Sequence, residues 1–194
     1  DCSLYSTIMF TYPNKIIAVS CRSLCPRPLE EQVSRIAQTG IKRLILREKD
    51  LTEKEYTQLA ERVLRACEDS CVELTLHFYP QAARSLGVKR LHMPLDLLTA
   101  ELCDEFDVTG TSVHSMEQAV LAKSLGASYV AAGHIFATDC KKGLPPRGTE
   151  FLESICTALD IPVYAIGGIS EENFPQILSA GAAGGCIMSG AMRS

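Results

Sequence analysis

Short apolar runs alternate with longer amphipathic stretches along the chain. The runs are about six residues long and rich in β-branched side chains, whereas the stretches between them carry apolar residues at helical spacing. Strands of a parallel sheet are buried on both faces and read as such runs, with helices between them. The pattern predicts seven helices and eight strands, the strands at 15–20, 41–46, 72–77, 88–93, 108–113, 128–133, 161–166 and 183–188.

Capping residues mark the starts of several of these helices. Thr52 with Glu55 three residues later forms a capping-box pattern, and apolar residues then recur at helical spacing. Ser115 and Ser170 are expected to cap two later helices, each of which ends at a glycine. These signals agree with the alternation of strand and helix.

Eight successive βα units in 194 residues predict an α/β fold, a compact (β/α)8 TIM barrel formed as one domain over residues 1–194. Residues 1–14 precede the first strand as an N-terminal extension. The chain stops soon after the eighth strand, so we expect the eighth helix to be missing or to lie outside these residues. An open doubly wound sheet would need a Gly-rich turn after the first strand, but the segment there reads CRSLCPRP.

Composition and charge narrow the classes of partner. The net charge is −4 and no basic run could follow a phosphate backbone, which argues against nucleic acid. The longest apolar stretches are about eight residues, well short of the ~20 that a membrane helix needs. Nine cysteines occur without a CxxC pair, so we expect reduced thiols, a cytoplasmic protein and no structural zinc.

The carboxyl ends of the strands are where a barrel of this type carries its chemistry. Gly167 and Gly168 follow the seventh strand, and Ser189 and Gly190 follow the eighth. Backbone N–H groups at these places can approach a phosphate closely, so the four residues are predicted to bind one. The alternative is that the glycines only form a tight turn.

Histidines follow three of the strands. His134 opens a long loop, 133–148, where an imidazole could exchange protons near neutral pH at the barrel mouth. It is the candidate catalytic acid or base; the alternative is a structural histidine bonded to a neighbouring loop. His77 and His92 also stand at strand ends, and for each the structural interpretation is preferred.

Charged residues at the second and sixth strand ends are candidates for anion binding. Arg47 and Lys49 flank Glu48, and the two cations either clamp an anionic substrate or belong to a charge-balanced rim. Lys141 is a plausible anion binder within the long loop. No spacing of acidic residues predicts a metal site.

Four motifs in order along the chain carry a family resemblance. They are LREKDLTEKE at 46–55, GTSVHSMEQA at 110–119, GHIFATDCKKG at 133–143, and AIGGIS with IMSG near the end. Together they resemble the thiamine phosphate synthase/TenI family. The resemblance implies a (β/α)8 barrel, a homodimer, and a thiazole phosphate as the small-molecule partner.

The resemblance implies two possible activities. Synthases of the family join hydroxymethylpyrimidine diphosphate to thiazole phosphate and use magnesium for the departing pyrophosphate, which Arg47 and Lys49 would hold. This chain departs from their pattern, because Ile45 stands in place of a Gln and His77-Phe78 in place of an Asn-Asp pair. A second segment linked to magnesium, GQxD, reads PLDL at 94–97. The carboxylates associated with magnesium are therefore absent from their usual positions, unless Asp96 shifts into register.

Thiazole tautomerases of the family carry His where synthases carry Pro, and His134 matches that position. The main prediction is therefore a metal-independent thiazole tautomerase, an isomerase without cofactor in which His134 moves the proton. The alternatives are a thiamine phosphate synthase, a transferase that would need Mg²⁺, and a non-catalytic phosphate-binding barrel. The residues implied to contact substrate are Arg47, Lys49, Ser112, Thr138 and Lys141, beside the phosphate site at Gly167, Gly168, Ser189 and Gly190.

Overall fold

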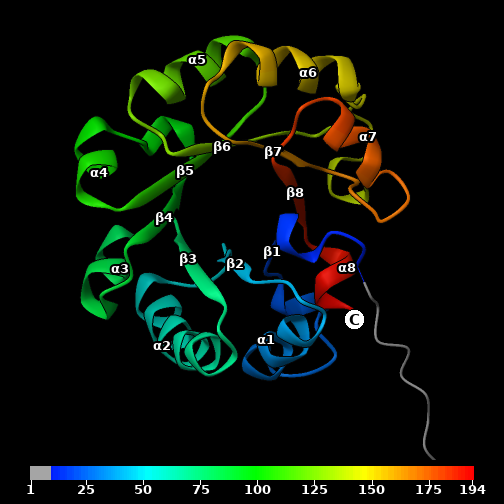
Figure 1. Cartoon of the computed structure of the whole chain (residues 1–194). Coiled ribbons are helices and arrows are strands. Elements are labelled where there is room, and N and C mark those ends of the chain that lie inside the picture. Colours follow the sequence, from blue (N-terminus) through cyan, green and yellow to red (C-terminus); the bar gives the residue numbers. More distant parts are fainter. Residues whose placement is uncertain (1–9) are drawn as a thin grey trace, which may run out of the picture.

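Eight parallel strands close into a barrel in the computed structural model, which describes residues 10–194 (Figure 1). Neighbours in the barrel follow sequence order, and β1 pairs with β8 to complete the ring. The predicted TIM barrel is confirmed. The strands are β1 Ile16–Val19, β2 Arg43–Leu46, β3 Glu73–His77, β4 Arg90–Met93, β5 Val108–Val113, β6 Tyr129–Gly133, β7 Val163–Ile166 and β8 Gly184–Ile187.

Helices surround the barrel on its outside (Figure 1). The α-helices are α1 Leu29–Gln38, α2 Glu53–Ser70, α3 Pro80–Leu86, α4 Ala100–Glu105, α5 Met116–Ser124, α6 Gly148–Ala158, α7 Phe174–Ser179 and α8 Ser189–Met192. Four 3-10 helices span η1 Pro13–Lys15, η2 Arg22–Leu24, η3 Leu95–Leu97 and η4 Asp139–Lys141. Within the described residues, no helix is long and apolar enough to cross a membrane.

Two of the three predicted capping residues cap a helix, and the third does not. Thr52 and Glu55 form the predicted capping box, and Ser115 accepts from the Gln118 N–H at the start of α5. Ser170 instead accepts from the N–H of Asn173, so it closes a turn before α7.

Two expectations about the chain ends change. A one-turn helix, α8, follows β8, which corrects the expectation that the eighth helix is missing or lies outside these residues. Most of the predicted extension, residues 1–9, lies outside the described residues. Its last part forms η1, which leads directly into β1.

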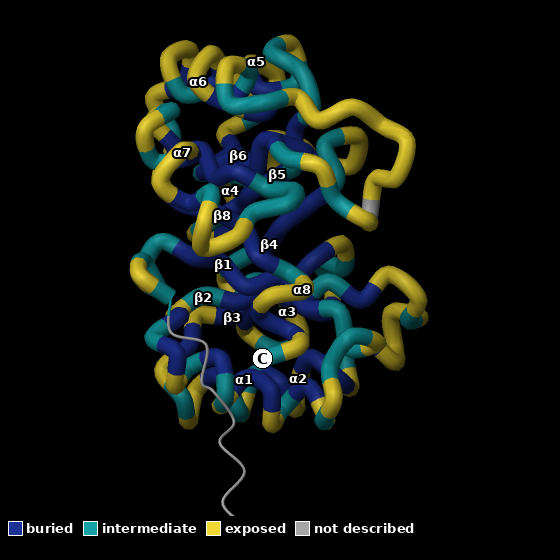
Figure 2. The backbone as a smooth tube through the Cα atoms, turned by 90° about the vertical axis from the view of Figure 1, so that its right-hand side faces the viewer, coloured by how far each residue is buried: buried dark blue, intermediate teal, exposed yellow. Residues whose placement is uncertain are grey.

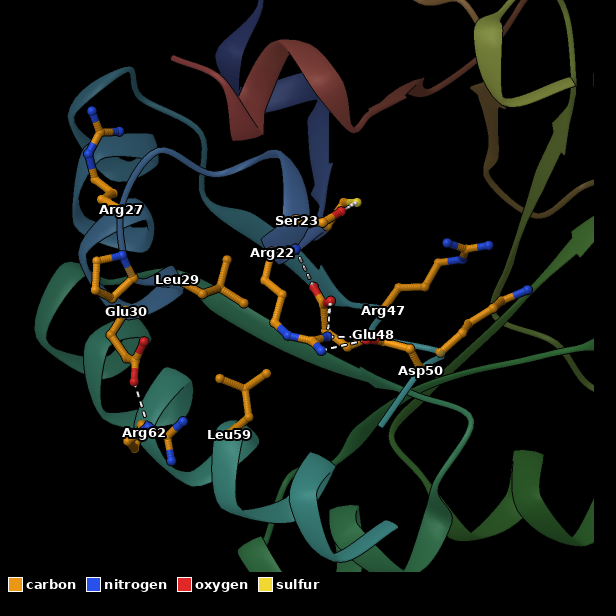
Figure 3. A pocket seen from close by; sticks show the side chains of 13 residues that line it. Arg22, Ser23, Arg27, Leu29, Glu30, Arg47, Glu48, Asp50, Leu59 and Arg62 are labelled. Carbon is orange, nitrogen blue, oxygen red and sulfur yellow. Dashed lines mark hydrogen bonds and ion pairs between the residues drawn. The ribbon is translucent and has the colours of Figure 1, made fainter. Parts of the chain in front are cut away.

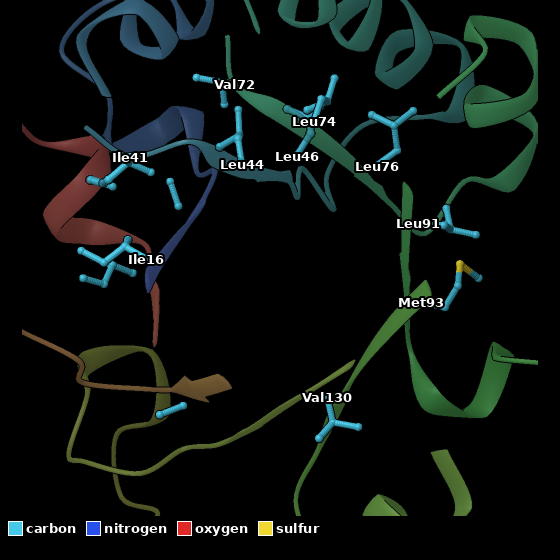
Figure 4. Close-up of a cluster of buried hydrophobic side chains, with 14 of the residues drawn as sticks. Ile16, Ile41, Leu44, Leu46, Val72, Leu74, Leu76, Leu91, Met93 and Val130 are labelled. Atoms are coloured by element: carbon cyan, nitrogen blue, oxygen red, sulfur yellow. The ribbon is translucent and has the colours of Figure 1, made fainter. Parts of the chain in front are cut away.

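Alternating strand residues divide the core into two layers. Side chains such as Leu44, Leu46 and Leu76 point away from the barrel axis and pack under the helices (Figure 4). Ile45, between the two leucines in sequence, belongs instead to a smaller cluster inside the barrel. The strands are accordingly dark blue inside the molecule in Figure 2, and most exposed backbone lies in helices and loops. This period of two decides which residues reach the barrel interior.

A tyrosine ring fills much of the barrel interior because the neighbouring strand offers it space. Tyr129 on β6 is 6% exposed and packs inside the barrel. Gly110 on β5 faces it, and a Cβ atom at that position would lie 2.0 Å from the Tyr129 ring. The glycine is therefore required by the close approach of the ring, which also brings the Tyr129 hydroxyl toward β4.

Candidate active site

Arg47 directly follows β2 and is fixed by its backbone. Its N–H donates to the hydroxyl of Ser20, a fully buried residue just after β1, at 2.7 Å. The alternation that directs Ile45 inward continues to Arg47 two residues later. In Figure 3 its side chain extends away from Arg22. Arg47 is therefore placed at the carboxyl end of the barrel, where sites of this fold lie.

Glu48 is tied to the β1 loop and not to its neighbours in sequence. Its carboxylate accepts from the backbone N–H of Arg22 at 3.0 Å and from the Arg22 guanidinium at 2.9 Å. The same guanidinium donates to Asp50 (Figure 3). That hydrogen bond is the main cause of a lowered pKa for the Asp50 carboxyl. Arg22 therefore binds both carboxylates, Glu48 and Asp50, with one guanidinium.

A cleft of about 640 Å³ adjoins this ion-pair cluster (Figure 3). On one side it is closed by a salt bridge between Arg62 on α2 and Glu30 on α1, with an N···O distance of 2.6 Å. On the other side it reaches Arg47 and Lys49. The lining residues are Cys21, Arg22, Ser23, Arg27, Pro28, Leu29, Glu30, Arg47, Glu48, Lys49, Asp50, Leu59 and Arg62.

Three cations at the mouth have no carboxylate partner among the described residues: Arg47, Lys49 and Lys141. Partial burial lowers the pKa of Lys49, and the positive charges of Arg47 and Lys141 lower it further. The loop after β6 therefore brings Lys141 close enough to Lys49 for the two charges to interact. Such a cluster favours an anion that would relieve the repulsion.

Two histidines stack inside the mouth. The ring centroids of His77 and His92 are 5.8 Å apart, and the two residues are 7% and 5% exposed. Burial lowers the pKa of His77 to about 3 and that of His92 to about 4. His92 bonds the Tyr129 hydroxyl through Nδ1 at 2.8 Å and the Ser112 hydroxyl through Nε2 at 3.0 Å. Both rings are neutral at physiological pH, so they add no positive charge to the mouth.

Tyr56 of α2 holds the ends of β2 and β3 together. Its buried hydroxyl donates to the Leu46 carbonyl at 2.6 Å and accepts from the His77 N–H at 2.8 Å. Leu46 pairs with Leu76 in the sheet register, so Arg47 and His77 are the next residues along the two neighbouring strands. The hydroxyl therefore fixes the spacing of both site residues.

His134 is enclosed by its own loop. It is 9% exposed, and its ring nitrogen Nε2 donates to the Leu144 carbonyl at 3.3 Å. Its backbone carbonyl accepts from the Arg147 N–H at 3.0 Å. The loop beyond it is largely exposed (Figure 2). These bonds resemble the alternative interpretation of His134, a structural histidine bonded to a neighbouring loop, except that the loop is its own.

The two glycines after β7 lie against the start of that same loop. Gly167 and Gly168 have φ of +97° and +65°, and a Cβ on Gly167 would lie 2.3 Å from the Cβ of His134. The Gly167 carbonyl accepts from the Phe136 N–H. Close packing is therefore one sufficient reason for glycine here. Ser189 is exposed at the start of α8, on the neighbouring strand end.

The remaining predicted contacts are partly connected to these groups. Ser112 is bonded to His92 and stands at the mouth. Thr138 lies in the turn before Lys141, whose N–H donates to the Thr138 carbonyl at 3.1 Å. Arg47, Lys49 and Lys141 thus form one cationic cluster through the effect of the other two charges on the pKa of Lys49, and Ser112 belongs to the histidine network.

A family model described as thiamine monophosphate synthase matches residues 16–191. The chain belongs to this family. It is 31% identical over 180 residues to the thiamine-phosphate synthase of Syntrophomonas wolfei, covering 90% of this chain and 86% of that protein. It is 32% identical over 164 residues to the thiamine-phosphate synthase of Chlorobium luteolum, covering 82% and 77%.

A solved member of the family has the same fold. The thiamine phosphate pyrophosphorylase from Pyrococcus furiosus superposes with a TM-score of 0.80 at 23% identity, over 93% of this chain and 88% of that one. At that identity the likeness supports the fold alone.

The main functional prediction from the sequence, a thiazole tautomerase acting as an isomerase, is wrong. The family members that match this chain over most of its length carry the name of the synthase, so the alternative is the supported one. The resemblance to tautomerases rested on His134, whose ring nitrogen is bonded within its own loop. A shared residue type did not imply a shared role.

Sequence reasoning missed two residues of the mouth. Arg22 was considered only as part of a segment that lacks a Gly-rich turn, yet it binds both Glu48 and Asp50. Phe78 was noted only as a departure from the family pattern, yet it is 40% exposed with φ of +74°. Glu48 lies between two cations, Arg47 and Lys49, and this pattern could have suggested that Glu48 pairs with a residue elsewhere in the chain. Nothing in the sequence indicates the positive φ of Phe78.

Proposed function

We propose that this chain is a thiamine-phosphate synthase, a transferase that joins hydroxymethylpyrimidine diphosphate to thiazole phosphate. The observation that carries the proposal is the cluster of Arg47, Lys49 and Lys141, which have no carboxylate partner among the described residues. A diphosphate is opposite to this cluster in sign and similar to it in number of charges. The names of the matching relatives support the same reaction.

The reaction needs charge stabilisation more than proton transfer. The thiazole ring nitrogen attacks the methylene carbon that bears the diphosphate, a carbon–nitrogen bond forms, and the carbon–oxygen bond breaks. The diphosphate leaves with the electron pair, and the nitrogen becomes a thiazolium cation without losing a proton. Cations fixed beside the leaving group stabilise that developing charge. A ring nitrogen bonded within a loop, as at His134, is compatible with this chemistry.

The backbone of Arg47 is held, and Glu48 is kept from pairing with its neighbours, before any substrate arrives. The Ser20 hydroxyl fixes the backbone of Arg47, and Arg22 binds Glu48 between Arg47 and Lys49. Because the Glu48 carboxylate is bonded to Arg22, it does not pair with Arg47 or Lys49 on either side of it. Preorganisation of this kind lowers the cost of reorganising charge during the reaction.

Magnesium does not fit the residues of this mouth. Among the described residues no group of three or more His, Cys, Asp and Glu could hold a metal ion. Glu48 and Asp50 are both bonded to Arg22, and Asp96 is exposed on η3. Mg²⁺ prefers carboxylate oxygens, and within residues 10–194 the two carboxylates that flank Lys49 are both bonded to Arg22. We therefore assign the diphosphate to the cations and derive no step through a metal.

The thiazole phosphate remains assigned to the β7 and β8 ends as a prediction. Gly167 and Gly168 follow β7, and Ser189 and Gly190 follow β8, which pairs with β7 in the barrel. A phosphate there would share the mouth with the cationic cluster, because β1 alone separates β8 from β2. The homodimer implied by the family resemblance also stays a prediction.

Charge-neutralising variants test the assignment of the diphosphate. Lys141→Gln removes one of the three cations, whereas Lys142→Gln removes an adjacent cation whose side chain is 80% exposed and 3.9 Å from Asp139. We expect Lys141→Gln to lower kcat/KM for the pyrimidine diphosphate by about tenfold or more, and Lys142→Gln to leave it within about twofold. Equal effects of the two variants would contradict the assignment.

A further inference from the structure

Five rings contact one another in series and form a column through the barrel, in which the first pair meets edge-on and the last two pairs are stacked. Ring centroids are 5.7 Å apart for Tyr164 and Tyr129, and 5.6 Å apart for Tyr129 and His92. The column continues through His77, 5.8 Å from His92, and ends at Phe78, 6.3 Å from His77. The planes of the last two rings differ by 23°, so Phe78 presents a nearly parallel ring at the end of the column.

Phe78 holds an uncommon backbone conformation to occupy this place. Its φ is +74°, and the N–H of Tyr79 donates to the His77 carbonyl across it at 3.0 Å. This is a γ-turn with positive φ at the central residue. Residues that carry a Cβ atom rarely adopt such a φ. Backbone strain of this kind tends to persist at functional sites.

The surroundings hold the turn in place. The Phe78 N–H donates to the His92 carbonyl at 3.1 Å. On the other side of the turn, the Tyr79 hydroxyl donates to the Leu51 carbonyl at 2.8 Å. The Tyr79 ring also meets the Phe78 ring edge-on, with centroids 4.9 Å apart. The turn is therefore fixed from two sides, and the ring it carries remains 40% exposed.

The exposed ring lies next to the cationic cluster. Leu46 pairs with Leu76, so Arg47 and His77 are the next residues on the two strands, and Phe78 follows directly. A diphosphate on Arg47 and Lys49 would hold whatever it is attached to beside β3. In the proposed reaction, a flat pyrimidine ring is one methylene group away from the diphosphate.

We propose that Phe78 is the platform on which the pyrimidine ring of the substrate stacks, as the next ring of the column. This inference rests on the proposed function, which supplies the pyrimidine. Stacking uses the face of the ring and leaves the methylene carbon free to be attacked by the thiazole nitrogen. Phe78 thereby orients the pyrimidine, while the cations hold its leaving group.

A fluorescent variant tests the stacking directly, without the reaction. The chain contains no tryptophan, so Phe78→Trp introduces a single tryptophan at the proposed platform, which can be excited apart from the tyrosines. Val120→Trp, at a 52% exposed position on α5, is the matched control. Titration with hydroxymethylpyrimidine, which carries no phosphate, should give saturable quenching in Phe78→Trp only. No saturable change, or equal changes in both variants, would overturn the proposal.

A glycine variant separates binding from stability. Phe78→Gly removes the ring and suits the positive φ, so we expect Tm to be unchanged or higher. We expect KM for the pyrimidine diphosphate to rise at least about fivefold, with KM for thiazole phosphate unchanged and Phe78→Tyr close to wild type. A structural role for Phe78 predicts the reverse, a lower Tm with KM unchanged.

The platform role of Phe78 and the proposed function can be contradicted separately. If the wild type forms thiamine phosphate while Phe78→Gly keeps its KM, the platform is wrong and the proposed function stands. If the wild type forms no thiamine phosphate, the proposed function is wrong. In that case saturable quenching of Phe78→Trp by hydroxymethylpyrimidine would still support a pyrimidine platform, and its absence would overturn it.

Discussion

His77 and His92 stack inside the barrel mouth with ring centroids 5.8 Å apart, and burial keeps both rings neutral. The two residues are paired in the register of β3 and β4. A histidine pair in this position makes the mouth sensitive to acid, since protonation of either ring would place a charge in a poorly solvated site beside Arg47.

We expect stability to fall as the pH is lowered from about 6.5 towards 4. The unfolded chain binds protons on both histidines near pH 6.5, whereas His77 and His92 in the native state resist protonation until about pH 3 and 4. Each histidine can contribute a slope of up to about 1.4 kcal/mol per pH unit in this window. Urea unfolding at several pH values measures how the free energy of unfolding changes over this window.

A ring without a titrating nitrogen isolates the contribution of one histidine. The His77 side chain makes ring contacts, so His77→Phe is expected to preserve stacking and to reduce the slope between pH 6.5 and 4. The Phe variant should therefore lose less stability than wild type on acidification. Parallel stability curves for the two proteins would show that His77 does not account for the effect.

Glu48 is expected to matter for stability more than an exposed carboxylate does. Glu48→Ala leaves the Arg22 backbone N–H without its acceptor and takes one of two carboxylates from the Arg22 guanidinium, which keeps Asp50. Because Glu48, which accepts these bonds, is only 5% exposed, the loss should cost about 1–3 kcal/mol of the free energy of unfolding. The control is Glu61→Ala, which breaks an exposed pair with Arg65 and should cost less than about 1 kcal/mol. Urea unfolding at pH 7 compares them, and equal losses would contradict the role of Glu48.

Gly110 and Tyr129 are expected to be coupled. Gly110→Ala would place a Cβ 2.0 Å from the Tyr129 ring and force the ring away from His92, at a cost of about 1–3 kcal/mol or more. Tyr129→Leu makes room for the new methyl group. The double variant should therefore be more stable than the sum of the two single losses predicts, by at least about 0.5 kcal/mol. Strict additivity in thermal unfolding would argue against the contact.

The barrel could be predicted because the signals for its strands and helix starts lie within short stretches of the sequence. Parallel strands are buried on both faces, so β2 reads as an apolar run within 41–46, and the structure begins it at Arg43. Thr52 and Glu55 lie within one turn of the helix they cap. The alternation of such segments then left few architectures to consider.

The mouth could be predicted only in part, because its contacts join distant segments. Arg22 and Glu48 are 26 residues apart, and they meet only when β1 and β2 pair in the observed register. The enclosure of His134 depends likewise on the path of its loop back to Leu144. Residue types at strand ends therefore indicated where the site lies, but not which side chains remain free to act.

Product analysis tests the central claim most directly. Purified protein is incubated with hydroxymethylpyrimidine diphosphate and thiazole phosphate, with each substrate alone as control, and the products are separated by chromatography. The proposed function predicts thiamine phosphate and an equal amount of pyrophosphate only when both substrates are present. Absence of thiamine phosphate with folded protein, or pyrophosphate release that does not require the thiazole, would contradict it.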